Sequence, residues 1–218
     1  MTIQSQHPLD LGGSVATGQS PRVERDCLDE VWRAAAPFLR TRQNDTHTPL
    51  SFFFAELLLD EHPQADDLVV RLAILLHDSG WSAIDEDRIF SEGFVADWRT
   101  SDVRYLHEVE GCRIARDLLP PLGYPEGVVD AVTRIIDGHD TRPVAHCLED
   151  ELVRDADRLW RFTPAGIALA SGWFDKTPAE YYEQLTERTY SELITDAARR
   201  MATAELARSR ELLKLDIL

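Results

Sequence analysis

The chain has 218 residues, of which 44% are apolar and 28% are charged, a composition typical of one globular domain with a sizeable core. Its 39 acidic residues outnumber its 23 basic residues, which gives a formal net charge of −16 at pH 7. Such a surface repels nucleic-acid phosphates and anionic membranes. It therefore argues against general nucleic-acid binding and against membrane docking. A small anionic substrate could still bind in a locally basic pocket.

The cysteines and the hydropathy pattern indicate the compartment. Cys27, Cys112 and Cys147 lie far apart and form no CxxC pair, which argues against a disulfide framework or a structural zinc site. No apolar run approaches the roughly 18 residues that span a bilayer. The first residues also lack the basic and apolar regions of a secretory signal. We expect a cytoplasmic protein.

Helical spacing of apolar residues dominates the sequence after an aperiodic tail, and strand alternation is nearly absent. We expect residues 1–22 to be a flexible N-terminal tail and residues 23–218 to form one all-α domain of about seven helices. Residues 81–100, which include Phe90, Phe94 and Trp98, are interpreted as a loop or short-helix insertion that could act as a lid. The helices are predicted over 25–39, 47–59, 66–77, 101–119, 126–136 and 148–160, with a last long helical region over 178–215.

Four of the seven histidines lie within apolar helices or at their ends, whereas His7, His62 and His146 lie in exposed contexts. A residue as polar as histidine is unusual in apolar surroundings unless it is paired or bound to a metal. These four residues are His47, His77, His107 and His139.

Two carboxylates accompany the histidines. Asp78 follows His77 at the end of an apolar helix, and Gly80 is expected to terminate that helix. Neighbouring helical residues point about 100° apart, so His77 and Asp78 can flank one metal ion, or Asp78 can bridge two. Asp155 and Asp157 cannot share one helix face, and the Ala-Asp-x-Leu surroundings of Asp157 favour it as the inward residue.

The ordered set of His47, His77-Asp78 and Asp157 resembles the signature of the HD-domain superfamily of metal-dependent enzymes, over roughly residues 25–175. The resemblance implies a helical fold in which His47, His77, Asp78 and Asp157 hold one metal ion. Subfamilies with two metals supply two further histidines, so Asp78, His107 and His139 would hold the second ion. Single-metal members exist, and in such a protein His107 and His139 would be core or supporting histidines.

The donor chemistry agrees with this resemblance. Imidazoles and carboxylates together suit one or two divalent Fe, Mn, Co, Ni or Zn ions better than Mg or Ca, which prefer oxygen ligands. Two ions about 3.5–4 Å apart can hold a bridging hydroxide and polarise a substrate oxygen.

Basic residues near the expected ligands are candidates for substrate binding. Arg154 lies one turn before Asp157, and Arg142 follows His139 by three residues, so either could bind a phosphate or carboxylate through its guanidinium fork. Each could equally be a solvated surface charge. Lys176 is a third substrate-binding candidate, and further candidates are Arg42, Arg104 and Arg158.

Among acidic residues, Asp78 and Asp140 are the catalytic candidates, with Asp140 interpreted as a general acid. Glu108, Glu110 and Asp140 could alternatively orient histidines or be surface acids. Trp81 stands where similar 5′-nucleotidases carry an acidic residue, which argues against that activity.

Three functions compete. The leading one is a phosphohydrolase that cleaves a small phosphoester or nucleotide through a metal-bound hydroxide. The alternative is a mixed-valent di-iron oxygenase that cleaves a C–P or C–C bond, although the stretch Trp32–Asn44 lacks the Tyr and Glu of organophosphonate-cleaving members. The third is a non-catalytic metal-binding regulatory module. The last helical region could mediate a homodimer or pack on its own domain.

Overall fold

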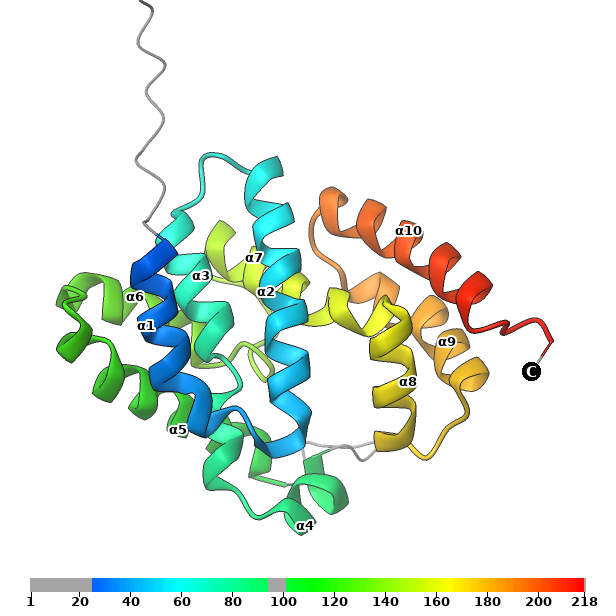
Figure 1. Ribbon diagram of the computed structural model, residues 1–218, viewed down its shortest axis with the longest axis horizontal. Helices are drawn as coiled ribbons and strands as arrows, with labels where there is room; N and C mark the ends of the chain where they lie inside the picture. The colour runs from blue at the N-terminus through cyan, green and yellow to red at the C-terminus, as the bar shows by residue number, and fades with distance from the viewer. Residues whose placement is uncertain (1–24, 94–100, 218) are drawn as a thin grey trace, which may run out of the picture.

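Helices and short helical turns make up the structure, a computed structural model that describes residues 25–93 and 101–217 (Figure 1). No β-strand occurs in these ranges, so the predicted all-α class is confirmed. The helices are α1 (Arg25–Ala35), α2 (Asn44–Glu61), α3 (Asp67–Leu76), α4 (Glu86–Arg88), α5 (Val103–Leu118), α6 (Glu126–Ile136), α7 (Leu148–Leu159), α8 (Pro164–Trp173), α9 (Pro178–Glu187) and α10 (Asp196–Leu212). Short turns relevant to the site are η2 (Thr41–Gln43), η3 (Ser79–Ala83), the π-helical turn η4 (Ile89–Gly93) and η7 (Trp160–Phe162).

Helix α3 is the centre of the arrangement. It begins at Asp67, after the N-cap residue Asp66, whose side chain accepts a hydrogen bond from the amide of Val69 at 3.1 Å. Every residue from Leu72 to Leu76 is fully buried, because α2, α6 and α7 all pack against this helix. Burial of each large aliphatic side chain contributes roughly 1.5–3 kcal/mol. Helix α3 is therefore held firmly in place, together with His77 and Asp78, which follow its last residue.

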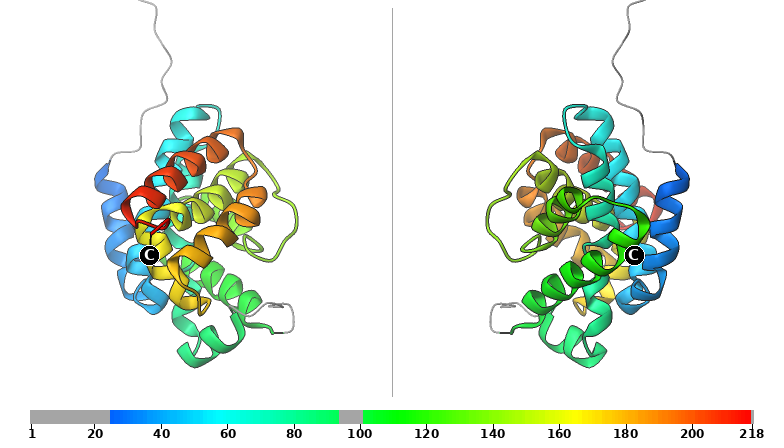
Figure 2. Two further views of the ribbon diagram at one scale, coloured as in Figure 1. Left: turned by 90° about the vertical axis from the view of Figure 1, so that its right-hand side faces the viewer. Right: turned by 90° about the vertical axis from the view of Figure 1, so that its left-hand side faces the viewer.

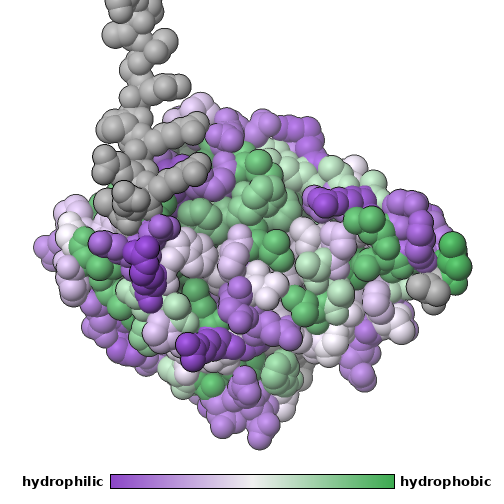
Figure 3. Space-filling model, in the orientation of Figure 1, coloured by the Kyte–Doolittle hydropathy of each residue, from purple (hydrophilic) through white to green (hydrophobic). Residues whose placement is uncertain are grey.

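The other helices lie on two sides of this centre (Figures 1 and 2). Helices α5 and α6 pack together on one side, and α8, α9 and α10 form the other side, with α10 in contact with α7 and α8. The surface in Figure 3 mixes hydrophilic and hydrophobic residues. Within the described residues, no helix has both the length and the apolar composition needed to cross a bilayer.

Two predicted boundaries at the N-terminal side differ from the structure. Helix α1 ends at Ala35 and a 3₁₀ turn containing Pro37 follows, because a residue before proline disfavours helical geometry. Helix α2 begins at Asn44 rather than at His47, so Pro49 lies inside the helix and not in its first turn. The predicted tail, residues 1–22, lies outside the described residues, as do Phe94 and Trp98 of the predicted insertion.

The C-terminal half also differs. The predicted region 178–215 is two helices, α9 and α10, separated by Arg188–Thr195. Helix α8 was not predicted, although Thr163 caps it by accepting from the amide of Gly166 at 3.0 Å. The glycines in α8, Gly166 and Gly172, weaken its helical signal in the sequence.

Candidate metal centre

Six polar side chains from five parts of the chain converge on one buried point. Their exposed fractions run from 0% to 6%, which is costly for groups of this polarity unless they are mutually paired or bind an ion. Helix α2 supplies one in its first turn, the end of α3 supplies two adjacent ones, and α5, the turn after α6 and the end of α7 supply one each. They are His47, His77, Asp78, His107, His139 and Asp157.

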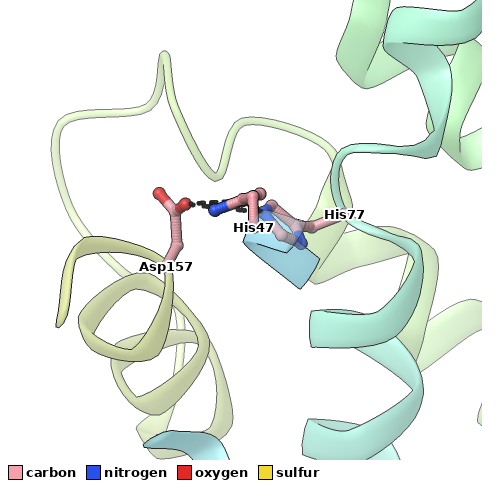
Figure 4. A group of neighbouring side chains, drawn as sticks. All are labelled: His47, His77 and Asp157. Atoms are coloured by element: carbon pink, nitrogen blue, oxygen red, sulfur yellow. Dashed lines mark hydrogen bonds and ion pairs between the residues drawn. The ribbon is translucent and has the colours of Figure 1, made fainter. Parts of the chain in front are cut away.

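One side of the cluster is formed by His47, His77 and Asp157 (Figure 4). The Nε2 atoms of the two histidines are 3.0 Å apart, and they lie 3.3 and 3.5 Å from Oδ1 of Asp157. Two ligand atoms bound at right angles to an ion, each about 2.1 Å from it, would be separated by about 3.0 Å. The spacing of these three side chains therefore fits a transition-metal ion.

Asp78 faces both sides of the cluster with different oxygens. Its Oδ2 atom lies 3.1 Å from Nε2 of His47 and 3.6 Å from Nε2 of His77. Its Oδ1 atom lies 3.7 Å from Nε2 of His107 and 3.6 Å from Nε2 of His139. A carboxylate placed in this way can bind two neighbouring cations, one through each oxygen.

The hydrogen bonds of the histidines leave lone pairs directed at the cluster. Nδ1 of His77 lies 2.8 Å from the carbonyl of Ile74, and Nδ1 of His139 lies 2.9 Å from the carbonyl of Ile136. A carbonyl can only accept, so each Nδ1 carries a proton, and when the ring is neutral the lone pair lies on Nε2. This pattern is typical of histidines that bind a metal through Nε2, and the residues present fit one.

The cluster concentrates negative charge in a buried place. Burial by itself would raise the pKa of Asp78, but the charges of His77 and Arg42 outweigh it and hold this pKa well below its ordinary value. For Asp157 the same burial effect is outweighed by the hydrogen bond from His77 and by the charge of Arg161. Burial lowers the pKa of His107 to about 3, aided by the charge of His139. Both carboxylates are thus ionised and His107 is neutral near pH 7.

His139 differs from His107 in charge. Burial opposes its protonation, but the hydrogen bond with Asp78 and the charges of Asp140 and Glu108 raise its pKa to about 10. In the metal-free protein a proton on His139 therefore balances part of the carboxylate charge. A metal ion that binds this nitrogen must displace that proton.

Two arginines border the cluster. Arg42, in η2, is buried with its guanidinium carbon 5.0 Å from the ring centre of Trp81 and 4.9 Å from that of Trp173, and its NH2 atom is 3.5 Å from Oδ2 of Asp78. Its backbone and that of Gln43 are left-handed, with φ of 57° and 58°. Arg161, in η7, has its NH2 atom 3.9 Å from Oδ2 of Asp157.

A cavity of about 410 Å³ opens beside Arg42. Arg40, Glu86, Phe90 and Trp173 also line it, so two arginines and one glutamate adjoin aromatic surface there. Its volume lies in the range of small-molecule sites.

The arginines predicted to bind substrate, Arg142 and Arg154, have other partners. Arg154 donates to Oδ1 of Asp150 at 2.7 Å and to the carbonyls of Arg142 and Gly138 at 2.7 and 2.9 Å. Arg142 donates to Oδ2 of Asp150 and to the carbonyls of Asp137 and Val144. These bonds fasten the loop after α6 to α7, so both guanidiniums are directed at the protein itself. Lys176 lies exposed in the loop between α8 and α9.

Asp140 and Glu108 lie beside the histidines of α5 and of the turn after α6. The structure groups Asp140 with His107 and His139, and its Oδ2 atom is 3.2 Å from Arg104. Burial would raise the pKa of Asp140, but the charges of Arg104 and His139 lower it well below its ordinary value, which does not suit a general acid. Glu108 accepts hydrogen bonds from the amides of Asp140 and Thr141 at 2.9 and 3.0 Å and thereby holds the turn of His139. Glu110 instead pairs with Arg113.

Sequence reasoning missed the contributions of Asn44 and Trp81. Asn44, the one asparagine in the sequence, donates from its buried amide to the carbonyl of Asp78 at 3.1 Å. Trp81 donates from its indole nitrogen to Oδ1 of Asp78 at 2.9 Å. The position of Trp81, one turn after His77, was the available signal.

Both the sequence and the fold of the chain are similar to those of HD-domain proteins. Residues 44–161, more than half of the chain, match the family model of the HD domain. The fold is similar to the crystal structure of a predicted HD superfamily hydrolase from an uncultured Thermotogales bacterium, with a TM-score of 0.58 and 20% sequence identity, over 86% of this chain and 89% of that chain. The comparison with curated proteins gives no match.

Proposed function

The chain belongs to the HD-domain family, and on this premise we propose that it is a metal-dependent phosphohydrolase that acts on a small phosphoester or nucleotide. The observation that carries the proposal is the placement of Asp78 between two pairs of histidines, with one oxygen toward each pair. Binding of two cations would use this carboxylate as the shared ligand.

In this proposal the centre is binuclear. His47, His77, Asp78 and Asp157 would hold the first ion, because the Nε2 atoms of the two histidines lie 3.0 Å apart and 3.1–3.6 Å from the facing oxygens of the two aspartates. The second ion would be held by Asp78, His107 and His139, with Asp140 as a neighbouring carboxylate. The mixed nitrogen and oxygen donors favour Fe, Mn, Co, Ni or Zn.

Bound divalent ions would act as Lewis acids and activate water for attack on phosphorus. The chain itself contributes a fixed anionic frame. Asp78 and Asp157 are ionised because the charges around them lower their pKa values, and they bind cations without first losing a proton. The carbonyls of Ile74 and Ile136 hold the Nδ1 protons of His77 and His139, so that Nε2 is the nitrogen left for a metal ion that displaces its proton.

Arg42 and Arg161 are the residues that we propose to bind the anionic group of the substrate. We prefer Arg42 and Arg161 to Arg142 and Arg154 for this role. Arg42 lies beside Asp78 and Arg161 lies beside Asp157, and both of these carboxylates are proposed ligands. The aromatic rings of Trp81 and Trp173 hold the Arg42 guanidinium in place while leaving it charged. The cavity beside Arg42 would receive the part of the substrate that does not react. A role of Lys176 in substrate binding stays a prediction.

Asp140 is proposed as a neighbouring carboxylate or ligand of the second ion, in place of the general acid that the sequence predicts. Its lowered pKa keeps the carboxylate ionised, and Arg104 at 3.2 Å stabilises that charge. An ionised carboxylate cannot donate a proton to a leaving group, and one with so low a pKa is also a weak base.

The test combines metal content with turnover. Protein purified without added metal is analysed for metal per chain and by EPR, then assayed with p-nitrophenyl phosphate and nucleoside monophosphates. We expect bound transition metal and phosphate release in the wild type, and loss of both in Asp78→Ala with helicity retained by circular dichroism. The matched control is Asp130→Ala, at an exposed position on α6, which should keep both.

Other outcomes have defined meanings. Full metal occupancy in Asp78→Ala would overturn the metal assignment. Two irons per chain with a mixed-valent EPR signal, O₂ consumption and no phosphate release would favour the di-iron oxygenase. Bound metal without turnover in either assay would favour a regulatory module.

A further inference from the structure

Trp81 contacts two of the residues that would hold the second ion. Its indole nitrogen donates to Oδ1 of Asp78 at 2.9 Å, and its ring stacks on His107 with centroids 4.0 Å apart and planes 10° apart. The side chain is 1% exposed, so neither contact competes with solvent.

The bond to Asp78 acts on the oxygen that faces the second side of the cluster. Oδ1 is the atom 3.7 and 3.6 Å from Nε2 of His107 and His139, whereas Arg42 and His47 approach Oδ2. A carboxylate oxygen has two lone pairs, so Oδ1 can accept from the indole and still bind a cation. The indole bond fixes the rotation of the carboxylate about its χ2 angle, which in turn fixes where Oδ1 points.

The stacking on His107 replaces a hydrogen bond that the other histidines have. His77 and His139 are oriented by Nδ1 bonds to main-chain carbonyls, at 2.8 and 2.9 Å. Nδ1 of His107 is buried and has no hydrogen-bond partner among the described residues. A histidine without such a bond is free to rotate unless packing prevents it, and the indole face supplies that packing.

Trp81 is itself held by a hydrophobic cluster that is separate from the main core. Ile89 and Val103 are buried against it, and Ile84 packs at the edge. These residues come from η4, the start of α5 and the segment after η3, and none of them lies next to a ligand in the sequence. The insertion after α3 thus builds a rigid support for one side chain, at the side of the cluster where His107 lies.

We propose that Trp81 is a positioning residue for the second metal subsite, the one formed by Asp78 Oδ1, His107 and His139. It orients two ligands of that subsite, Asp78 by a hydrogen bond and His107 by stacking. This inference rests on the proposed binuclear centre.

The test is stepwise binding of Co²⁺ to metal-free protein, followed by visible absorption and calorimetry. Trp81→Phe keeps a ring for stacking and removes the indole N–H. We expect it to weaken the second step about tenfold and the first step much less, because Arg42 and His47 still hold Oδ2 of Asp78. Trp81→Leu removes both contacts, and should weaken the second step by up to about 100-fold.

Trp160→Phe is the matched control. Trp160 is fully buried 4.8 Å from the ring of His47, on the first side of the cluster, and its indole nitrogen has no hydrogen-bond partner among the described residues. We expect this variant to keep both binding steps. A purely structural role of Trp81 would instead weaken both steps together and lower the melting temperature of the metal-free protein.

A measurement on the wild type makes the test independent of variant folding. In a Zn²⁺ titration followed by NMR, the indole N–H resonance of Trp81 should shift more with the second equivalent, which binds Oδ1 of Asp78, than with the first, which binds Oδ2. Two normal binding steps in Trp81→Phe, or an indole resonance that moves only with the first equivalent, would overturn the proposal and leave the phosphohydrolase intact. A single binding step in the wild type would also overturn it. No binding at all would instead refute the metal centre itself.

Discussion

Asp155 and Asp157 lie two residues apart on α7 and direct their carboxylates to opposite sides of the helix, as a turn of about 200° between them requires. Asp157 faces the cluster, with Oδ1 3.3 Å from Nε2 of His47. Asp155 accepts from the amides of Ile194 and Thr195, each at 2.8 Å. One carboxylate belongs to the site, and the other anchors the start of α10.

This division predicts opposite effects of two substitutions. Asp155→Ala leaves two inward-facing amides unpaired, so we expect the free energy of unfolding to fall by about 3 kcal/mol with metal content retained. Asp157→Asn keeps the shape of the side chain, so metal content should fall sharply with a smaller loss of stability. Chemical denaturation and metal analysis of both variants provide the check. Loss of metal in Asp155→Ala under conditions where it is folded would contradict the assignment.

The sequence was sufficient to predict which six side chains cluster, but not which residues surround them. His77 and Asp78 could be placed because the buried helix before them has a strong local signal, and the order of the other four residues matched a known pattern. Their role as metal ligands stays a prediction. The roles of Arg142 and Arg154 could not be predicted, because both depend on Asp150, which accepts from both guanidiniums. Spacing from a ligand gives no information about which acceptor a long side chain reaches.

Long-range contacts also explain the other differences. The break between α9 and α10 depends on Asp155, which is 39 residues before Ile194, so local periodicity across 178–215 could not reveal it. The sequence predicts that Gly80 terminates the helix that precedes it. Helix α3 instead ends earlier, at Leu76, and the absence of a side chain at Gly80 allows η3 to lie close to α5.

The approach at Gly80 gives the second prediction. A Cβ atom at this position would lie 1.9 Å from the carbonyl oxygen of His107 and 2.5 Å from the amide nitrogen of Gly111, both rigid backbone atoms. Gly80→Ala must therefore push η3 away from α5, which separates Asp78 from His107. We expect a loss of several kcal/mol in unfolding free energy, about 3 or more, together with impaired metal binding.

The control for Gly80→Ala is Gly127→Ala, in α6, where an added Cβ meets no atom within 4 Å. Alanine is the better helix former, so this variant should be more stable by about 0.5–1 kcal/mol. Thermal unfolding of the two variants beside the wild type measures the contrast. Equal stabilities for Gly80→Ala and the wild type would show that the close approach is not required.

The third prediction concerns Glu108, which holds the turn of His139. Its carboxylate accepts from the amides of Asp140 and Thr141 and from the Thr141 hydroxyl at 2.7 Å. Burial raises the pKa of Glu108, so a neutral side chain of the same shape should be tolerated. We expect Glu108→Gln to bind Co²⁺ like the wild type, whereas Glu108→Ala should weaken the second binding step and spare the first. Equal loss of both steps in Glu108→Ala would argue against a specific effect on His139.

The last prediction concerns the backbone strain that precedes α2. Gln43 is exposed and left-handed, with φ of 58°, a conformation that costs a residue with a Cβ roughly 1–2 kcal/mol. Glycine relieves this cost but loses about 0.5–1 kcal/mol of chain entropy on folding. We therefore expect Gln43→Gly to raise the unfolding free energy by about 0.5–1 kcal/mol, the difference between these two effects. In contrast, Glu183→Gly, at an exposed position within α9, should lower it by about 1 kcal/mol, because its backbone is already helical. Denaturant titration of the two variants distinguishes these signs, and a stability loss in Gln43→Gly as large as that in Glu183→Gly would show that the left-handed turn holding Arg42 carries no strain.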